Sequence, residues 1–185
     1  MWRRISGLFH PAAESGVGGL PAGRLSCVTG DRIAESACVF RIMANVQAEG
    51  GVVGYIDVSN KFDVVAAGCA GVATGRILVS QPDSAETALS VCAALAASGA
   101  VDLIVVDSAD SLWTEDDMDL VRDPDDDGPP PVKQIVREIA AGALKSGCAC
   151  LFTGMPANQC RGLSASQKAI AARVRHTIDL RYLPF

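Results

Sequence analysis

The chain has 185 residues and a formal net charge of −5, and 49% of its residues are hydrophobic. This length favours one globular domain, and the acidic balance argues against the overall electrostatic footprint of a nucleic-acid-binding protein. The seven cysteines are odd in number and scattered, a pattern typical of reduced thiols. Because the sequence also has no signal-peptide pattern and no run long enough to span a membrane, we expect a cytoplasmic protein.

Apolar runs alternate with segments of helical periodicity after an N-terminal lead at 1–17. In chain order we expect strands at 25–28, 52–57, 76–80, 101–107, 148–153 and 174–182, and helices at 33–49, 61–68, 83–98, 132–146 and 169–173. This alternation predicts an α/β domain over 18–185, in which a wound, mainly parallel β-sheet is flanked by helices on both faces. The last strand alternates in polarity and should lie at an edge.

Individual residues within these helices also have predicted positions. Val65 should face inward from the second helix, and Leu144 should belong to the buried stripe of the fourth. At the start of the third helix, Asp83 and Glu86 resemble a capping box.

The turn between the first strand and the first helix occupies the place of a phosphate-binding loop. There the motif G-x-x-x-x-G-K-[ST] cradles phosphates with backbone N–H groups and a lysine. Gly30 matches the first glycine, but Glu35 replaces the second, Ser36 the lysine and Ala37 the magnesium-binding hydroxyl residue. A carboxylate beside a phosphate repels it, by roughly 4 kcal/mol for unit charges about 4 Å apart at an effective dielectric near 20. The sequence therefore predicts ATPase architecture without ATPase activity.

Several longer runs resemble the bacterial RecA recombinases. They are the segments at 18–24, 55–57, 80–83, 98–108 and 174–181. The resemblance extends from about residue 18 to residue 181, and its specificity comes chiefly from 80–83 and 98–108. It implies a RecA-like ATPase core, a fold of the P-loop NTPase type.

Further departures from the family pattern affect catalysis. The resemblance places the family's catalytic glutamate at Ser59, which cannot act as a carboxylate base, and its γ-phosphate-sensing glutamine at Met155. Asp107, at the end of a strand, is the one ATPase residue that remains. Its alternative interpretation is a strand-end aspartate that caps the next turn.

The resemblance also implies losses in DNA binding and assembly. The family's first DNA-binding loop falls at 115–131, which is acidic and then proline-rich, so we expect an exposed, poorly ordered loop there. The second loop is shortened, and the family's filament-linking helix and C-terminal domain are missing from the chain. We expect weak or absent nucleic-acid binding, and the candidate patch for single-stranded DNA consists of Arg161, Lys168, Arg173 and Arg175.

Two possible metal sites are rejected on their chemistry. The acidic run at 123–128 opens like a calcium loop, but Gln134 stands where a bidentate glutamate is required and three prolines intervene. Cys148 and Cys150 share one face of a strand, but the chain has no C-x-x-C pair, so buried packing is the better interpretation. We expect no metal and no cofactor.

Truncated, degenerate RecA-like proteins of the ImuA type accompany error-prone translesion polymerases. The resemblance therefore implies a non-catalytic pseudo-ATPase that binds another protein, as an adaptor or regulator of RecA or a translesion polymerase in the bacterial DNA-damage (SOS) response. Two alternatives stay open. One is a residual nucleotide-binding ATPase of recombination or repair that uses Asp107. The other is a single-stranded DNA binder. No membrane partner is expected.

Overall fold

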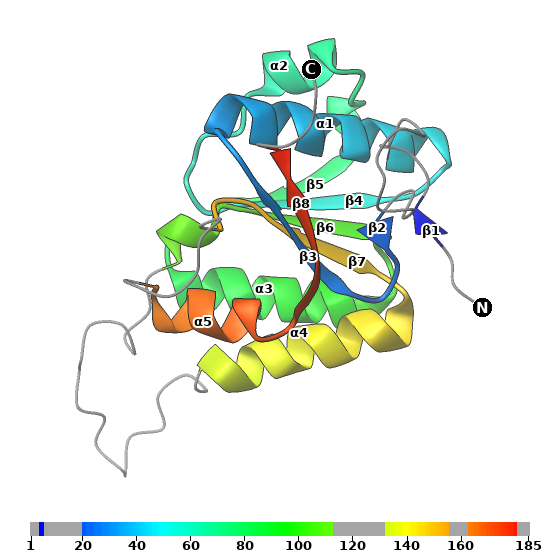
Figure 1. Ribbon diagram of the computed structural model, residues 1–185. Helices are drawn as coiled ribbons and strands as arrows, with labels where there is room; N and C mark the ends of the chain where they lie inside the picture. Colours follow the sequence, from blue (N-terminus) through cyan, green and yellow to red (C-terminus); the bar gives the residue numbers. More distant parts are fainter. Residues whose placement is uncertain (1–3, 6–19, 113–131, 156–162, 181–185) are drawn as a thin grey trace.

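The computed structural model describes residues 4–5, 20–112, 132–155 and 163–180, and its centre is a six-stranded parallel sheet (Figure 1). The strand order is β5-β4-β6-β7-β3-β8. The bounds are β3 Leu25–Thr29, β4 Val53–Asp57, β5 Ile77–Ser80, β6 Leu103–Asp107, β7 Ala149–Phe152 and β8 Val174–Asp179. The predicted parallel sheet with its last strand at an edge is therefore confirmed.

A separate two-stranded antiparallel ribbon joins the lead to the domain. Its strands are β1 (Arg4–Ile5) and β2 (Leu20–Pro21). Part of the N-terminal lead thus pairs with the segment that leads into the sheet.

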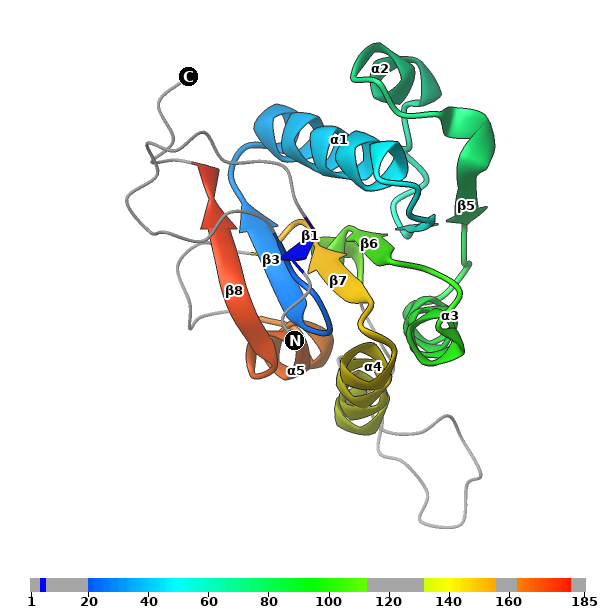
Figure 2. The ribbon, with the colours of Figure 1, turned by 90° about the vertical axis from the view of Figure 1, so that its right-hand side faces the viewer.

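Helices cover both faces of the sheet, as Figures 1 and 2 show. One face carries α1 (Arg32–Ala48) and α2 (Val64–Cys69). The other carries α3 (Ala85–Ser98), α4 (Val132–Ser146) and α5 (Ala165–Ala171). Short 3₁₀ turns, η1 (Thr74–Arg76) and η2 (Ala109–Ser111), precede β5 and follow β6.

The alternation of side chains along each strand divides the interior into two apolar cores. Leu103 and Val105 of β6 belong to the core under α1, whereas Ile104 and Val106 belong to the core under α3 and α4. All four are fully buried, which explains why the central strands are continuous apolar runs. At the α3–α4 contact the backbones approach so closely that a Cβ on Gly142 would lie 3.0 Å from the Ala97 nitrogen.

Three side-chain predictions within the helices are wrong. Val65 is 76% exposed, and Ala67 is the residue of α2 that is buried instead. Leu144 is 60% exposed, because small residues of α4 face α3 instead. The N-cap of α3 is Ser84, whose hydroxyl accepts the Thr87 N–H, so Asp83 is not the N-cap and its predicted capping box with Glu86 does not form.

The last helix begins earlier than predicted. A capping box formed by Ser164 and Gln167 starts α5 at Ala165 rather than at residue 169. The acidic segment at 115–131 lies outside the described residues. Among the residues that are described, no helix is both long and apolar enough to cross a bilayer.

Candidate functional site

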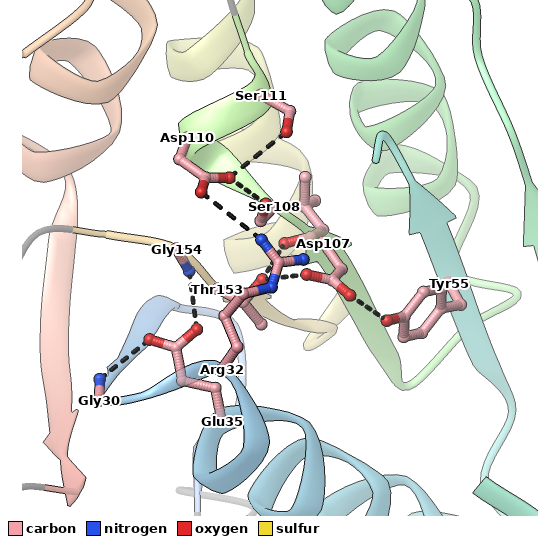
Figure 3. Close-up of polar contacts among 11 residues, drawn as sticks. Gly30, Arg32, Glu35, Tyr55, Asp107, Ser108, Asp110, Ser111, Thr153 and Gly154 are labelled. Atoms are coloured by element: carbon pink, nitrogen blue, oxygen red, sulfur yellow. Dashed lines mark hydrogen bonds and ion pairs between the residues drawn. The ribbon is translucent and has the colours of Figure 1, made fainter. Parts of the chain in front are cut away.

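The candidate site lies where the carboxyl ends of β3, β6 and β7 meet the start of α1 (Figure 3). This edge of a parallel sheet is where ligands usually bind in wound α/β folds. The space is small, about 30 Å³. It is lined by Arg32, Glu35, Ser36, Val39, Tyr55, Asp107, Ser108, Asp110, Thr153 and Gly154.

The Glu35 side chain bridges two loops by accepting hydrogen bonds from their backbones. Its Oε1 accepts the Gly30 N–H at 2.9 Å, and its Oε2 accepts the Gly154 N–H at 3.2 Å (Figure 3). Glu35 comes from the first turn of α1, and its exposed fraction is only 7%. Backbone N–H groups near a helix start are the donors that bind phosphates in related architectures. Here the protein's own carboxylate accepts from one such group, that of Gly30, and from the Gly154 N–H in the loop after β7.

A second carboxylate caps the same helix. Asp31 is the N-cap of α1, and its Oδ1 accepts the Ile33 and Ala34 N–H groups, both at 3.0 Å. Together with the two Glu35 bonds, four backbone donors around the loop are therefore paired with side chains of the chain itself. We call this arrangement of Asp31 and Glu35 the self-occupied cradle.

The electrostatic environment of the pocket is acidic. Burial raises the pKa of the Glu35 carboxyl, and the nearby Asp107 and Asp110 carboxylates raise it further, against the lowering effect of the two N–H donors. Arg32 is the cation beside them, with its Nη1 3.9 Å from the Asp110 Oδ2. Both members of this pair are about half exposed, so the ion pair is screened by solvent.

Both carboxylate oxygens of Asp107 accept hydroxyl groups. Tyr55 donates to Oδ2 at 2.5 Å and Thr153 donates to Oδ1 at 2.6 Å. Burial and the Asp107 charge both raise the pKa of Tyr55, which therefore remains a donor. The turn that follows Asp107 is closed by backbone groups instead, because the Ala109 N–H donates to the Thr153 carbonyl at 2.9 Å and the Ser111 N–H donates to the Ser108 carbonyl at 3.0 Å. The interpretation of the Asp107 side chain as a turn cap is therefore wrong.

The turn after β4 is capped by a different aspartate. Asp57 is fully buried, and its carboxylate accepts the backbone N–H groups of Lys61 at 2.9 Å and Phe62 at 3.1 Å. The Gln81 amide donates to it as well, at 3.0 Å. The acid that follows the second predicted strand thus has a structural role.

The structure brings together four of the seven predicted nucleotide-site positions. Glu35, Ser36 and Asp107 line the pocket, and Gly30 is bonded to Glu35. The other three are not among the residues that line the pocket. Ala37 is exposed on α1 outside the lining, Met155 is 7% exposed and packs in the apolar core, and Ser59 lies in the turn beside Asp107.

The predicted basic patch is only partly assembled. Arg173 and Arg175 line one groove, Lys168 is exposed on α5 outside that groove, and Arg161 lies outside the described residues. Cys148 and Cys150, weighed above as metal ligands, are 1% and 0% exposed. Within the described ranges, no group of three potential metal-ligating side chains was found.

Sequence reasoning missed several residues of the site. Asp31 had a usable signal, because an aspartate directly before a helical run is a common N-cap. Tyr55 and Thr153 had a weaker sequence signal. Side chains alternate along a strand, and this alternation places both residues on the same face of the sheet as Asp107. Gly154 had none, since its contact with Glu35 joins residues 119 positions apart.

Comparisons with known proteins give one consistent answer. The family model described as the RecA N-terminal domain matches residues 6–161. Protein RecA of Clostridium novyi (strain NT) is 34% identical over 140 residues, covering 74% of this chain and 40% of that protein. Protein RecA of Laribacter hongkongensis (strain HLHK9) is 45% identical over 98 residues, covering 52% of this chain and 28% of that protein. The chain thus spans less than half the length of these curated relatives.

A solved structure agrees at the level of fold. The RadB recombinase superposes with a TM-score of 0.57 at 15% identity, covering 91% of this chain and 79% of that one. At this identity the likeness concerns the fold alone.

Proposed function

Since the chain belongs to the RecA N-terminal domain family, we propose that it is a non-catalytic member, a pseudo-ATPase that acts by binding another protein. The observation that carries this proposal is the place of the Glu35 carboxylate. It accepts the Gly30 and Gly154 N–H groups beside the turn from β3 to α1, which in the sequence takes the place of a phosphate-binding loop, and this supports the proposal. A nucleotide would have to displace a buried side chain and then meet its negative charge.

The size and charge of the pocket support the same conclusion. A water molecule needs roughly 10–15 Å³ of such space, so the cavity of about 30 Å³ has room for about two waters. Small-molecule sites usually measure about 300–1,000 Å³. The carboxylates of Glu35, Asp107 and Asp110 also surround this space, with Arg32 as the cation beside them. A triphosphate is therefore opposed both sterically and electrostatically.

The side chains do not fit the magnesium that accompanies ATP in this fold. Magnesium requires near-octahedral oxygen ligands. Asp107, the one retained acid, already accepts hydroxyl groups on both oxygens, and Ala37 supplies no hydroxyl. Ser59 has no carboxylate with which to activate water.

The other half of the proposal is a protein-binding surface at the β5 edge of the sheet. Within the described residues β5 pairs only with β4, so its outer edge presents backbone N–H and C=O groups. The strand contains no charge and no proline, the usual devices that block edge pairing, and Leu78 and Val79 are 52% and 45% exposed. Helix α2 lies near the start of β5 (Figure 2), and it carries two further exposed valines, Val64 and Val65, which are 55% and 76% exposed.

We expect an extended segment of the partner to add to this edge as a further strand, which is a common mode of peptide recognition. The family resemblance favours RecA or a translesion polymerase as that partner, in the bacterial DNA-damage (SOS) response. An adaptor or regulator needs the folded sheet as a binding surface but does not need a nucleotide site, so this combination of features supports such a role.

Two measurements on the full chain test the proposal. Binding of Mg-ATP at a hundredfold excess over its dissociation constant would stabilise the fold by about 2.7 kcal/mol, and we expect no such thermal shift. In a pull-down with purified RecA and with a translesion polymerase, we expect one of them to bind. Leu78→Lys should abolish that association, whereas Ile33→Lys, at a residue 84% exposed on α1, should not. ATP-dependent stabilisation, or failure of both proteins to bind, contradicts the proposal.

A further inference from the structure

A basic groove lies at the opposite end of the sheet from the self-occupied cradle. It forms where β3 and β8 begin, beside α4, on the side shown at the bottom of Figure 2. Its volume is about 290 Å³, close to that of ordinary ligand sites. Arg24 contributes from the start of β3, Arg137 from α4, and Arg173 and Arg175 from the start of β8. We call it the arginine groove.

The concentration of charge in this groove contrasts with the rest of the protein. Four arginines line it in a chain whose net charge is −5, and no acidic residue is among its described lining. Arg137 and Arg175 are exposed, and within the described part of the chain neither makes an ion pair. Like charges gathered in a concave surface produce a local positive potential that attracts anions. The groove is therefore suited to a negatively charged ligand.

Apolar side chains distinguish this groove from a nucleic-acid site. Leu144, 60% exposed, and Ala140 line it beside the arginines. Proteins that bind single strands stack bases on aromatic rings, and no aromatic residue belongs to the described lining. Arginine with exposed leucine instead matches a peptide that carries both carboxylates and aliphatic side chains, because the guanidinium pairs well with carboxylate.

We propose that the arginine groove binds an acidic peptide segment of a partner protein, with an aliphatic side chain of that segment against Leu144. This proposal rests on the proposed adaptor role in that the ligand is a protein. It concerns a surface other than the β5 edge, which lies at the far side of the sheet from β8. An adaptor with two such surfaces can contact two proteins at once.

Fluorescence polarisation with a labelled synthetic peptide of alternating aspartate and leucine tests this inference on the full chain. We expect saturable binding that weakens as salt is added, because salt screens the exposed ion pairs between the groove arginines and the aspartates of the peptide. Arg137→Gln and Arg175→Gln should each weaken binding about two- to fivefold, the effect of about 0.4–1 kcal/mol from an exposed ion pair. Lys168→Gln removes the same charge from an exposed residue outside the groove and should leave binding unchanged.

Two further probes decide the class of ligand. A peptide in which serine replaces leucine should bind more weakly, and Leu144→Ser should reduce the difference between the two peptides. Absence of saturable binding, or equal binding by the arginine variants, overturns the inference. Tighter binding of a single-stranded oligothymidine than of the peptide overturns it in favour of nucleic acid. Because the probe is synthetic, these results do not depend on RecA, a polymerase or ATP.

Discussion

Replacement of Glu35 by glutamine should make the protein relatively more stable as the pH rises. Burial and the nearby carboxylates raise the pKa of Glu35 above its ordinary value of 4.5. The folded chain therefore keeps the Glu35 proton to a higher pH than the unfolded chain does. The contribution of this group to the free energy of unfolding is greatest below pH 4.5 and falls until the pH passes the raised folded pKa.

The magnitude follows from the difference between the folded and unfolded pKa values of Glu35. A difference of one pH unit corresponds to about 1.4 kcal/mol in the free energy of unfolding. Protonated glutamate and glutamine have nearly the same shape, and each can accept a hydrogen bond from Gly30 or Gly154. We therefore expect the stability of Glu35→Gln relative to the unaltered chain to rise from below pH 4.5 to above the folded pKa, by about 1.4 kcal/mol for each pH unit that separates the two pKa values.

Urea unfolding of the two proteins across this pH range provides the measurement, and their difference in free energy of unfolding cancels the titration of groups that do not interact with Glu35. Glu138→Gln makes the same change at an exposed position on α4 and serves as the matched control. The account of this carboxylate would be refuted if the difference in free energy of unfolding between Glu35→Gln and the unaltered chain stayed constant with pH. It would also be refuted if the unaltered chain became relatively more stable as the pH rises.

Three further substitutions test the packing around the site by urea unfolding. Tyr55→Phe should cost about 1–3 kcal/mol, because it leaves one Asp107 oxygen without its hydroxyl donor; an unchanged stability would contradict that bond. Met155→Gln should cost about 1–3 kcal/mol by burying an amide and should give no gain in ATP binding by calorimetry. Gly142→Ala should cost about 1–3 kcal/mol, because its Cβ would meet the Ala97 backbone; a stabilised variant would contradict the close α3–α4 contact.

The centre of the sheet was predictable from the sequence because its central strands are buried on both faces. The β6 residues 103–106 are all apolar and fully buried, as is typical of a parallel strand covered by helices on both faces. The helix starts were less predictable. At α3 and α5 they depend on single hydroxyl groups, Ser84 and Ser164, which an apolar pattern does not reveal.

The inward faces of short or crowded helices also escaped prediction. Leu144 fits a helical stripe by spacing, but Gly142 and Ala143 allow α4 to approach α3 closely and turn the leucine outward. Val65 lies in a helix of six residues, too short for periodicity to decide its orientation.

In the candidate site, too, the local sequence predicts some features, whereas others depend on contacts between distant segments. The sequence predicts that Glu35 stands where a phosphate-binding loop would have its second glycine, and it predicts repulsion of phosphate. It does not predict that the carboxylate bonds to Gly30 and Gly154, because the second contact depends on the path of the chain after β7. The partners of Asp107 are likewise set by the register of β4 and β7 beside β6.

Calorimetric titration of the purified full chain with Mg-ATP tests the central claim most directly. Because Glu35 already occupies the Gly30 and Gly154 donors, we predict no saturable heat, with any dissociation constant weaker than about 1 mM, which corresponds to about −4.1 kcal/mol. Stoichiometric binding in the micromolar range, about −8.2 kcal/mol or stronger, would show that the cradle opens for a triphosphate and would contradict the account.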